Sequence, residues 1–469
     1  MTEITVPISI TIKVCGQKIE YEEKIKAEEL EKGISRITQK IGGQVLKAGI
    51  DGLDEEIRNR IPNTWQNVGT EERSVISSVG WINYQRRIYK DDQGKLRKLV
   101  DEILGLEAYS RVSRVVEQMG AYLASESNYR EAADRLSWML KTEISHSAIQ
   151  RMAWKIGNQM ADMEDAEREQ LFAHGGEKKS GKIKTPILYG ESDGVWVHLQ
   201  REKRRSTEVR VGIMYSGKAP IGKKRNKLEN KCSVVAFDMG SEAWQEELLK
   251  KAHQKFDLTS VQLLIAGGDG NSWVKDSFAR FEIRQEYVLD RFHIYRAARG
   301  ALGNWRISRK IVRRLRQNGF EAVKDKLLDL IQSSEGKRKE KLKKFYVYLR
   351  NNCAGLQDLK YRGYSQNPGS LGAIEGNVDK LVVRRMKGRG RSWRRPGLRA
   401  MLALCQKKQV LRAMAFDYQP IVQPVKLKRK RYNLSVQYNE WTRGSMPVFS
   451  GPHQSKPWVK SLYRVAHGS

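Results

Sequence analysis

The sequence predicts a multidomain protein of the α+β class, in which an α/β domain with a helical insertion follows a helical region. First, the chain has 469 residues, more than one hydrophobic core usually holds, so several domains are expected. Second, a hydrophobic fraction of 39% is sufficient to build such cores. Third, short apolar strands and amphipathic helices alternate from residue 186 onward, which is typical of an α/β domain.

The charge balance predicts an anionic partner. Lys and Arg total 87 against 54 Asp and Glu, a net charge of +33. Such a charge repels itself within a compact fold, so a partner is expected to offset it. Nucleic acid is the first candidate, and an anionic membrane surface is the competing one. Because no apolar run approaches the roughly 18–20 residues of a membrane span, we expect a cytoplasmic, nucleoid-associated protein without membrane contact.

The cysteines exclude one class of metal site. They stand singly along the chain, without a Cys-x-x-Cys pair, at Cys15, Cys232, Cys353 and Cys405. A structural zinc site built on paired thiolates is therefore not expected. Any metal chemistry must come from carboxylates.

Residues 1–95 are predicted to form a mixed β/α region. Alternating apolar residues from Ile4 to Val14 indicate a strand, and Cys15-Gly16 turns the chain into a second strand near residues 18–25. A charged helix is expected at 27–65. A further β segment at 75–89 ends in the turn at 91–94.

Residues 96–173 are predicted to be helical and contain a candidate helix-turn-helix. An apolar helical face from Tyr129 to Leu136 is followed by Ser145, a good N-cap for a second helix. An ordinary helical hairpin fits the same pattern equally well. If the pair binds DNA, four side chains are placed to reach a groove: Ser147, Gln150, Arg151 and Lys155.

After a basic linker at 174–185, the pattern changes to that of a catalytic α/β domain. The expected elements are strands at 187–200, 207–215 and 232–237, a helix at 241–256, a strand at 261–266, a short helix at 272–278 and a strand at 286–289. This β-β-β-α-β-α-β order is that of a ribonuclease-H-like domain. The first part of the domain spans 186–302, basic helices at 303–365 interrupt it, residues 366–415 complete it with a helix near 372–386, and 416–469 form a basic tail.

Acidic residues at three places in this order suggest phosphoryl transfer with two metal ions, which requires converging carboxylates. Glu191 and Asp193 lie on the apolar face of the first strand, where carboxylates are costly to bury unless they are paired or bind a metal. Asp269 follows the fourth strand, at the edge where open α/β sheets place ligand groups. A plain Gly-Asp-Gly turn is the alternative interpretation of Asp269.

The third acid is expected on the helix after the insertion. Glu375 borders the packed side of this helix, and Asp379 is the rival ligand; both residues would also suit an ordinary surface helix. Glu375 is preferred because a basic run follows it that could hold the phosphate backbone: Arg384, Arg385, Lys387, Arg389, Arg391, Arg394 and Arg395. Trp393 within the run favours DNA over a merely solvated face.

Two further motifs have competing interpretations. Asp290 and His293 lie where the fifth strand meets the next helix; a satisfied structural histidine is expected there, and a secondary catalytic or DNA-positioning role is the alternative. The segment 212–219 nearly spells a phosphate-binding loop, but Ala219 replaces the metal-binding Ser or Thr and no helix follows, which excludes ATP hydrolysis.

Four segments, taken in order, resemble bacterial insertion-sequence transposases of the DDE class: GESDGVWVHLQ, GGDGNSWVK, VLDRFHIYRA and AIEGNVDKLVVRRMKGRG. The resemblance is to the ISLre-two type, distantly similar to the Mutator-like group, and covers roughly residues 70–415. It implies a ribonuclease-H-like domain with a helical insertion, and an acidic triad of Asp193, Asp269 and Glu375. Asp290 and His293 resemble a Cys-x-x-His pair of the Mutator-like relatives.

The resemblance also implies an activity. The triad would hold Mg²⁺ as two ions, with Mn²⁺ as a substitute. The enzyme would cut DNA at the terminal inverted repeats of its element and join the freed 3′-OH to target DNA, as a homo-oligomer on two DNA ends. The alternatives are a catalytically silent, transposase-derived DNA-binding protein and a ribonuclease-H-like nuclease acting on branched or hybrid nucleic acid.

Overall fold

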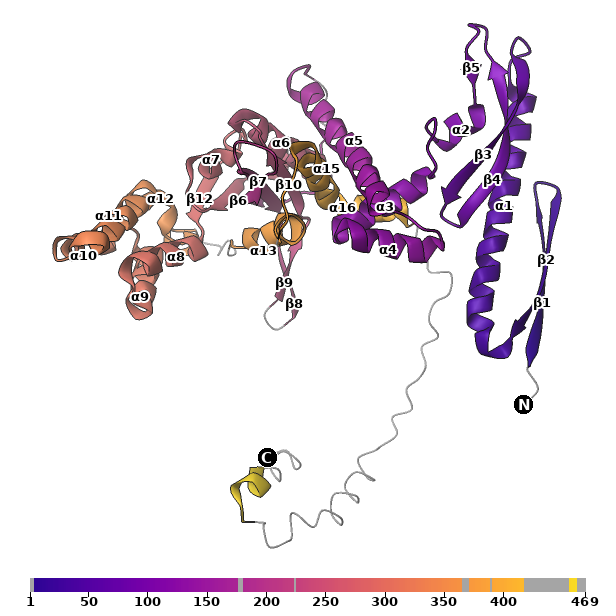
Figure 1. Cartoon of the computed structure of the whole chain (residues 1–469). Helices are drawn as coiled ribbons and strands as arrows, with labels where there is room; N and C mark the ends of the chain where they lie inside the picture. Colours follow the sequence, from indigo (N-terminus) through magenta and orange to yellow (C-terminus); the bar gives the residue numbers. More distant parts are fainter. Residues whose placement is uncertain are drawn as a thin grey trace. The chain divides into compact units, whose positions relative to one another are not determined.

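The computed structural model describes residues 4–175, 180–222, 225–364, 371–388, 390–416 and 455–461 (Figure 1). The chain divides into two units, Met1–Asp417 and Tyr418–Ser469. All the strands and long helices of the described residues belong to the first unit. No helix in the described ranges has an apolar stretch of the length needed to cross a lipid bilayer.

The N-terminal region is built from two hairpins and a long helix. The predicted hairpin is confirmed as β1 (Thr5–Val14) and β2 (Gln17–Lys26), and α1 (Leu30–Arg60) follows. The single β segment expected at 75–89 is instead a hairpin of β3 (Gln66–Ser77) and β4 (Gly80–Lys90), completed by β5 (Leu96–Arg97) and α2 (Leu99–Leu104). The sequence concealed the first strand of this hairpin because residues 66–74 are mostly polar. Gly80, at a φ of +96°, supplies the left-handed conformation the turn requires.

Five helices form the next layer. They are α3 (Arg114–Glu126), α4 (Tyr129–Leu140), α5 (His146–Phe172), α15 (Arg395–Gln406) and α16 (Lys408–Ala415). The predicted pair of helices is confirmed as α4 and α5, and the Ser145 hydroxyl accepts the N–H of Ala148 at 3.1 Å as the predicted N-cap. Helix α15 packs on α5 and α16 packs on α3, so residues from the end of this unit complete the layer.

The central sheet has five strands in the order β10-β7-β6-β11-β12. These are β6 (Ile187–His198), β7 (Ser206–Tyr215), β10 (Cys232–Phe237), β11 (Leu263–Gly268) and β12 (Gln285–Leu289). Strands β6, β11 and β12 are parallel, and β7 runs antiparallel to both β6 and β10. The five predicted strands and the α+β class are therefore confirmed. A further hairpin, β8 (Gly217–Gly222) and β9 (Arg225–Glu229), was not expected, and the loop-like motif at 212–219 runs from β7 into it.

Helices cover both faces of this sheet. On one face, α6 (Ser241–Lys255) buries Trp244 and Leu248 against Leu188 and Leu264. On the other face, a single buried cluster joins sheet residues such as Val211 to residues of α3, α4, α5 and α15. The helical layer and the sheet thus share one core. A short helix, α7 (Ser272–Lys275), follows β11.

The predicted basic insertion consists of helices with a core of their own. They are α8 (Arg291–Leu302), α9 (Trp305–Asn318), α10 (Glu321–Gln332), α11 (Gly336–Asn351) and α12 (Cys353–Leu356). The chain then returns to the sheet through α13 (Ile374–Val378), a π-helical turn (Asp379–Val383) and α14 (Arg384–Met386). The regular helix expected at 372–386 is therefore interrupted by a π turn, a feature often found near functional sites.

The contact between α5 and α15 yields a stability prediction. A Cβ atom on Gly157 of α5 would lie 2.4 Å from the carbonyl oxygen of Ala400 in α15, whereas a Cβ atom on Gly49 of α1 meets nothing within 4 Å. We expect Gly157→Ala to lower the free energy of unfolding by about 1–3 kcal/mol, because the two helices must separate. Gly49→Ala, the matched control, should raise it by about 0.5–1 kcal/mol through helix propensity alone. Urea unfolding followed by circular dichroism measures both, and an unchanged Gly157→Ala midpoint would contradict the packing described.

Candidate metal centre

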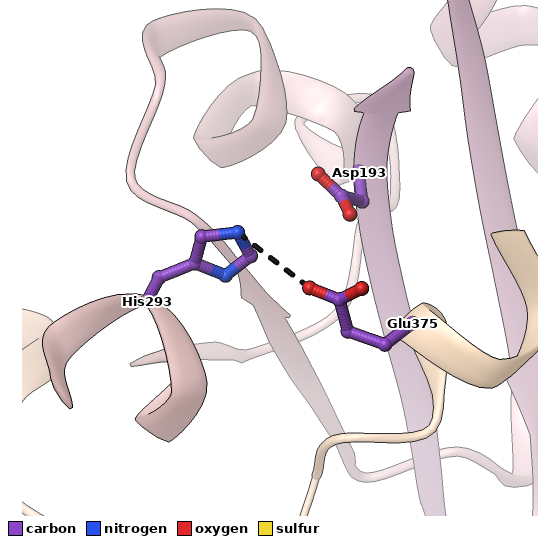
Figure 2. A group of neighbouring side chains, drawn as sticks. All are labelled: Asp193, His293 and Glu375. Carbon is purple, nitrogen blue, oxygen red and sulfur yellow. Dashed lines mark ion pairs between the residues drawn. The ribbon is translucent and has the colours of Figure 1, made fainter. Parts of the chain in front are cut away.

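Three side chains from distant parts of the sequence meet beside the sheet. Asp193 comes from β6, His293 from the first turn of α8 and Glu375 from the start of α13, and the three point toward one another in Figure 2. One ligand atom from each lies within 4.8 Å of the other two. His293 Nε2 is 3.7 Å from Glu375 Oε1. This is the only such group of metal-ligand residues in the part of the chain that the structure describes.

Asp193 is the most strongly perturbed member of the group. Its side chain is buried, and burial raises the pKa of Asp193 to about 6. The N–H of Gly194, which donates to the carboxylate at 2.8 Å, and the nearby His293 both act to lower this pKa. The negative charges of Glu375 and Asp269 raise it further. The negative charge of an ionised Asp193 is therefore only partly compensated, and a divalent metal ion would supply the remaining positive charge.

His293 owes its position to Asp290. The Asp290 carboxylate accepts the N–H of Phe292 at 2.7 Å and so caps the N-terminus of α8 directly after β12. His293 is buried, yet its Nδ1 has no hydrogen-bond partner among the described residues. This contradicts the expected satisfied structural histidine. The placement of a histidine one turn into a helix that starts at a sheet edge was the signal that could have identified it.

Glu191 serves a different purpose from its neighbour Asp193. It is buried, and its carboxylate accepts the N–H groups of Gly372, Ala373 and Ile374 at 2.8, 2.9 and 3.2 Å. It also accepts the hydroxyl of Tyr215 at 2.7 Å. Burial raises the pKa of Tyr215, with a further contribution from Glu191, so the hydroxyl stays protonated and donates. These bonds occupy the oxygens of Glu191 and fix the start of α13, which carries Glu375.

Asp269 lies next to the three-residue group but outside it. It follows β11 directly, and its two carboxylate oxygens accept the backbone and side-chain N–H groups of Asn271 at 2.9 and 2.6 Å. Its carbonyl oxygen accepts the hydroxyl of Tyr348 from α11 at 2.9 Å. Just before Asp269, Gly268 allows β11 to lie close to β6, because a Cβ atom there would lie 2.7 Å from the carbonyl oxygen of Ser192. Asp269 is thus held in a turn, close enough for its charge to act on Asp193.

The rival acid and most of the basic run have partners within the chain. Asp379 pairs with Arg384 at 2.7 Å, and neither side chain belongs to the three-residue group. Arg395 pairs with Glu202 at 2.7 Å and also with Asp238. Arg391 donates to the carbonyl oxygens of Arg384 and Arg385 at 3.0 Å.

The centre of the basic run is part of the core. Arg385 is buried, donates to the carbonyl oxygen of Ala124 at 2.6 Å and lies over the rings of Tyr129 and Trp393. Trp393 is also buried and donates to the carbonyl oxygen of Met386, so it does not form the DNA-facing surface that was expected. Lys387 and Arg394 are exposed. Arg389 lies outside the described residues.

The four side chains expected in a DNA groove all lie on α5. Ser147 and Arg151 are exposed and Gln150 is half-buried. Lys155 is paired with Glu107 at 2.9 Å and with Glu117 at 2.8 Å, so its charge is neutralised within the fold. Of this set, Arg151 offers the exposed cation.

The donor set determines which ions the centre can hold. Two carboxylates and one imidazole suit a divalent transition ion such as Mn²⁺, whereas Mg²⁺ prefers oxygen ligands alone. Three protein ligands leave positions for water or a substrate oxygen, as in catalytic metal sites. Asp269 is the adjacent carboxylate that could serve a second ion.

Comparison with known proteins places the chain in a family. The model of a family described as "Uncharacterised protein family (UPF0236)" matches residues 20–412. A relative from Streptococcus gallolyticus, "UPF0236 protein in vanSb 3'region", is 26% identical over 383 residues, which are 80% of this chain and 81% of the relative. The family match includes Asp193, His293 and Glu375 and extends from β2 into α16. The chain therefore belongs to the uncharacterised protein family UPF0236.

Proposed function

We propose that this chain is a DNA transposase of the DDE class, which cuts DNA at the ends of its element and joins the freed 3′-OH to target DNA. The observation that carries the proposal is the convergence of Asp193, His293 and Glu375, with ligand atoms within 4.8 Å of one another. A centre of this kind in a chain of charge +33 is suited to the phosphodiester backbone of nucleic acid.

Support for a ribonuclease-H-like catalytic domain comes from the sheet. The three consecutive antiparallel strands β6, β7 and β10 are followed by β11 and β12, which add in parallel on the other side of β6. Asp193 lies on the central strand, Asp269 follows the neighbouring parallel strand, and Glu375 enters from a later helix. This arrangement matches the three places at which such a domain carries its acids.

The proposed chemistry assigns a role to each residue. Asp193, His293 and Glu375 would hold a divalent ion, with Asp269 beside them for a second. The ions would supply Lewis acidity that activates water or a 3′-OH and stabilises the leaving oxygen. Glu191 would orient Glu375 through the start of α13, and Asp290 would orient His293 through the start of α8. Two copies of the chain would hold two DNA ends.

The central test is strand transfer with labelled DNA from the ends flanking the gene, in Mn²⁺ or Mg²⁺. We expect joined products from the wild type and a loss of at least about 100-fold in Asp193→Asn, Asp269→Asn and Glu375→Gln, since each variant removes a metal-binding charge. Asp379→Asn is the matched control and should retain activity, because Asp379 pairs with Arg384 away from the centre.

The outcomes separate the alternatives. DNA binding without metal-dependent cleavage would reject the transposase in favour of the silent DNA-binding protein. Cleavage without joining, on branched or hybrid substrates, would favour the nuclease. Full activity of any one triad variant would remove that residue from the catalytic set.

The raised pKa of Asp193 predicts a pH-dependent effect on stability. An acid whose pKa is higher in the folded state lowers stability as the pH rises through that pKa, here about 6, and this cost is absent at low pH. Without metal at pH 7.5, Asp193→Asn should therefore be more stable than the wild type by about 1 kcal/mol, and the difference should vanish toward about pH 4. Thermal unfolding in EDTA across this pH range measures the effect. A variant less stable than the wild type at pH 7.5 would contradict it.

Metal binding should reverse this order. Adding Mn²⁺ at pH 7.5 should raise the melting temperature of the wild type more than Mg²⁺ does, because His293 is one of the ligands. Asp193→Asn should show little response to either ion. Equal responses of both proteins would mean that the ion binds elsewhere.

Glu191→Gln tests the difference between a ligand and a positioning residue. The amide keeps the size of the side chain but accepts the three N–H groups of α13 more weakly, so Glu375 should be held less firmly. We expect the affinity for Mn²⁺ to fall about tenfold, as for other residues that orient a metal ligand. Calorimetric titration measures this affinity. Loss of binding as complete as in Asp193→Asn would instead identify Glu191 as a ligand.

A further inference from the structure

Helix α9 carries a dense run of exposed positive charge. Its sequence, WRISRKIVRRLRQN, contains no acidic residue. Its exposed cations have no ion-pair partner among the described residues: Arg306, Arg309, Lys310, Arg313 and Arg314. By contrast, Lys155, Arg384 and Arg395 are all paired with carboxylates. An external polyanion would therefore find unneutralised charge on α9, as it would on α11, where the exposed Arg338 and Lys341 also have no ion-pair partner among the described residues.

All of these cations except Arg314 line a groove that leads to Glu375 of the candidate metal centre. One hollow, of about 1060 Å³, is bordered by Arg306, Arg309 and Arg313. A second hollow, of about 680 Å³, is bordered by Glu375 of the metal centre. The two hollows share Arg291, Arg316, Asp358 and Lys360, so they are neighbouring parts of one groove. Asp358 binds Arg316 at 2.6 Å and Arg291 at 3.4 Å, which fixes the boundary between the two parts.

Four aromatic rings along this groove are exposed to solvent, although a surface without a binding function usually carries polar side chains. Trp305 is 48% exposed, Phe292 52%, Tyr361 41% and Tyr295 37%. Phe292 borders the hollow that reaches Glu375, and the other three border the hollow on α9. Exposed aromatic rings between free cations are the combination that binds unpaired bases and the backbone joining them. Paired bases in a duplex cannot stack on such rings, so a duplex would use only the cations.

We propose that the groove along α8 and α9 binds single-stranded DNA, with bases stacked on Trp305 and the other rings, and leads the strand to the Asp193–His293–Glu375 centre. The proposal rests on the proposed function in taking DNA as the substrate. It adds that the reacting strand is unpaired next to the centre. In this proposal, the insertion binds the DNA strand, whereas the acidic residues hold the metal ions.

The test is binding of fluorescein-labelled oligonucleotides, single-stranded and duplex of the same sequence, measured by anisotropy in EDTA with the full chain. We expect Trp305→Ala to weaken single-strand binding by about 5- to 100-fold, as for other stacked bases, and to change duplex binding by less than about twofold. Trp305→Phe should restore most of the affinity, because a ring remains. Trp81→Ala, at another exposed tryptophan on β4, is the matched control and should change neither.

The cations are tested by the salt dependence of binding. Arg309→Ala with Arg313→Ala should reduce the slope of log affinity against log salt by about 0.7 for each phosphate that the variant no longer binds. Arg338→Ala with Lys341→Ala removes the same charge from α11, at residues that border neither hollow, and should leave the slope unchanged.

Three outcomes would overturn the inference: single-strand binding unaffected by Trp305→Ala, equal losses for single strand and duplex, or an equal effect of the α11 pair. The proposed function fails in a different way. If Trp305-dependent single-strand binding is found but no metal-dependent cleavage occurs, the groove stands and the transposase assignment falls. If cleavage depends on Asp193 while Trp305→Ala binds single-stranded DNA normally, the transposase assignment stands and the groove proposal falls.

Discussion

The arrangement of this molecule depends on one buried carboxylate. Glu191 of β6 accepts three successive N–H groups at the start of α13 and so ties the chain that returns from the insertion to the central strand. The partial positive charge of these N–H groups compensates the burial of the acid. Without these bonds, the start of the segment that carries Glu375 would lose its polar anchor on β6. The sheet, the insertion and the metal centre are consequently held together where β6 is most buried.

The candidate metal centre and helix α9 of the insertion carry opposite charges. At the centre, Asp193 and Glu375 bring negative charge together around His293, whose Nδ1 is unsatisfied among the described residues, an arrangement that suits a cation. On the insertion, α9 gathers exposed positive charge that no carboxylate of the described chain neutralises, an arrangement that suits an anion. A metal ion at the first and a phosphate backbone along the second would relieve both. The proposed function would meet both requirements with one substrate class, metal-bound nucleic acid.

Sequence patterns predicted the sheet well because its strands are apolar and regularly spaced. They also predicted Asp193 as a site residue, because an acid on a buried strand face must be paired or bind a metal, and the structure places it in the three-residue group. They favoured a structural role for His293 over a catalytic one, since its approach to Glu375 of α13 arises only in the folded chain. Lys155 and Arg385 were expected on a DNA surface for a similar reason: their partners, Glu117 and the Ala124 carbonyl, are distant in sequence. The π turn and the β8–β9 hairpin depend on packing that periodicity does not record.

The shared core of the helical layer and the sheet has a consequence for biosynthesis. Helix α15 contributes Leu398, Met401 and Leu402 to the cluster that covers one face of the sheet, yet it follows all five strands in the chain. During translation that face stays partly uncovered until α15 leaves the ribosome, and a product that stops before it retains an exposed apolar surface. Incomplete chains would therefore be prone to aggregation and removal, which limits the accumulation of shortened forms.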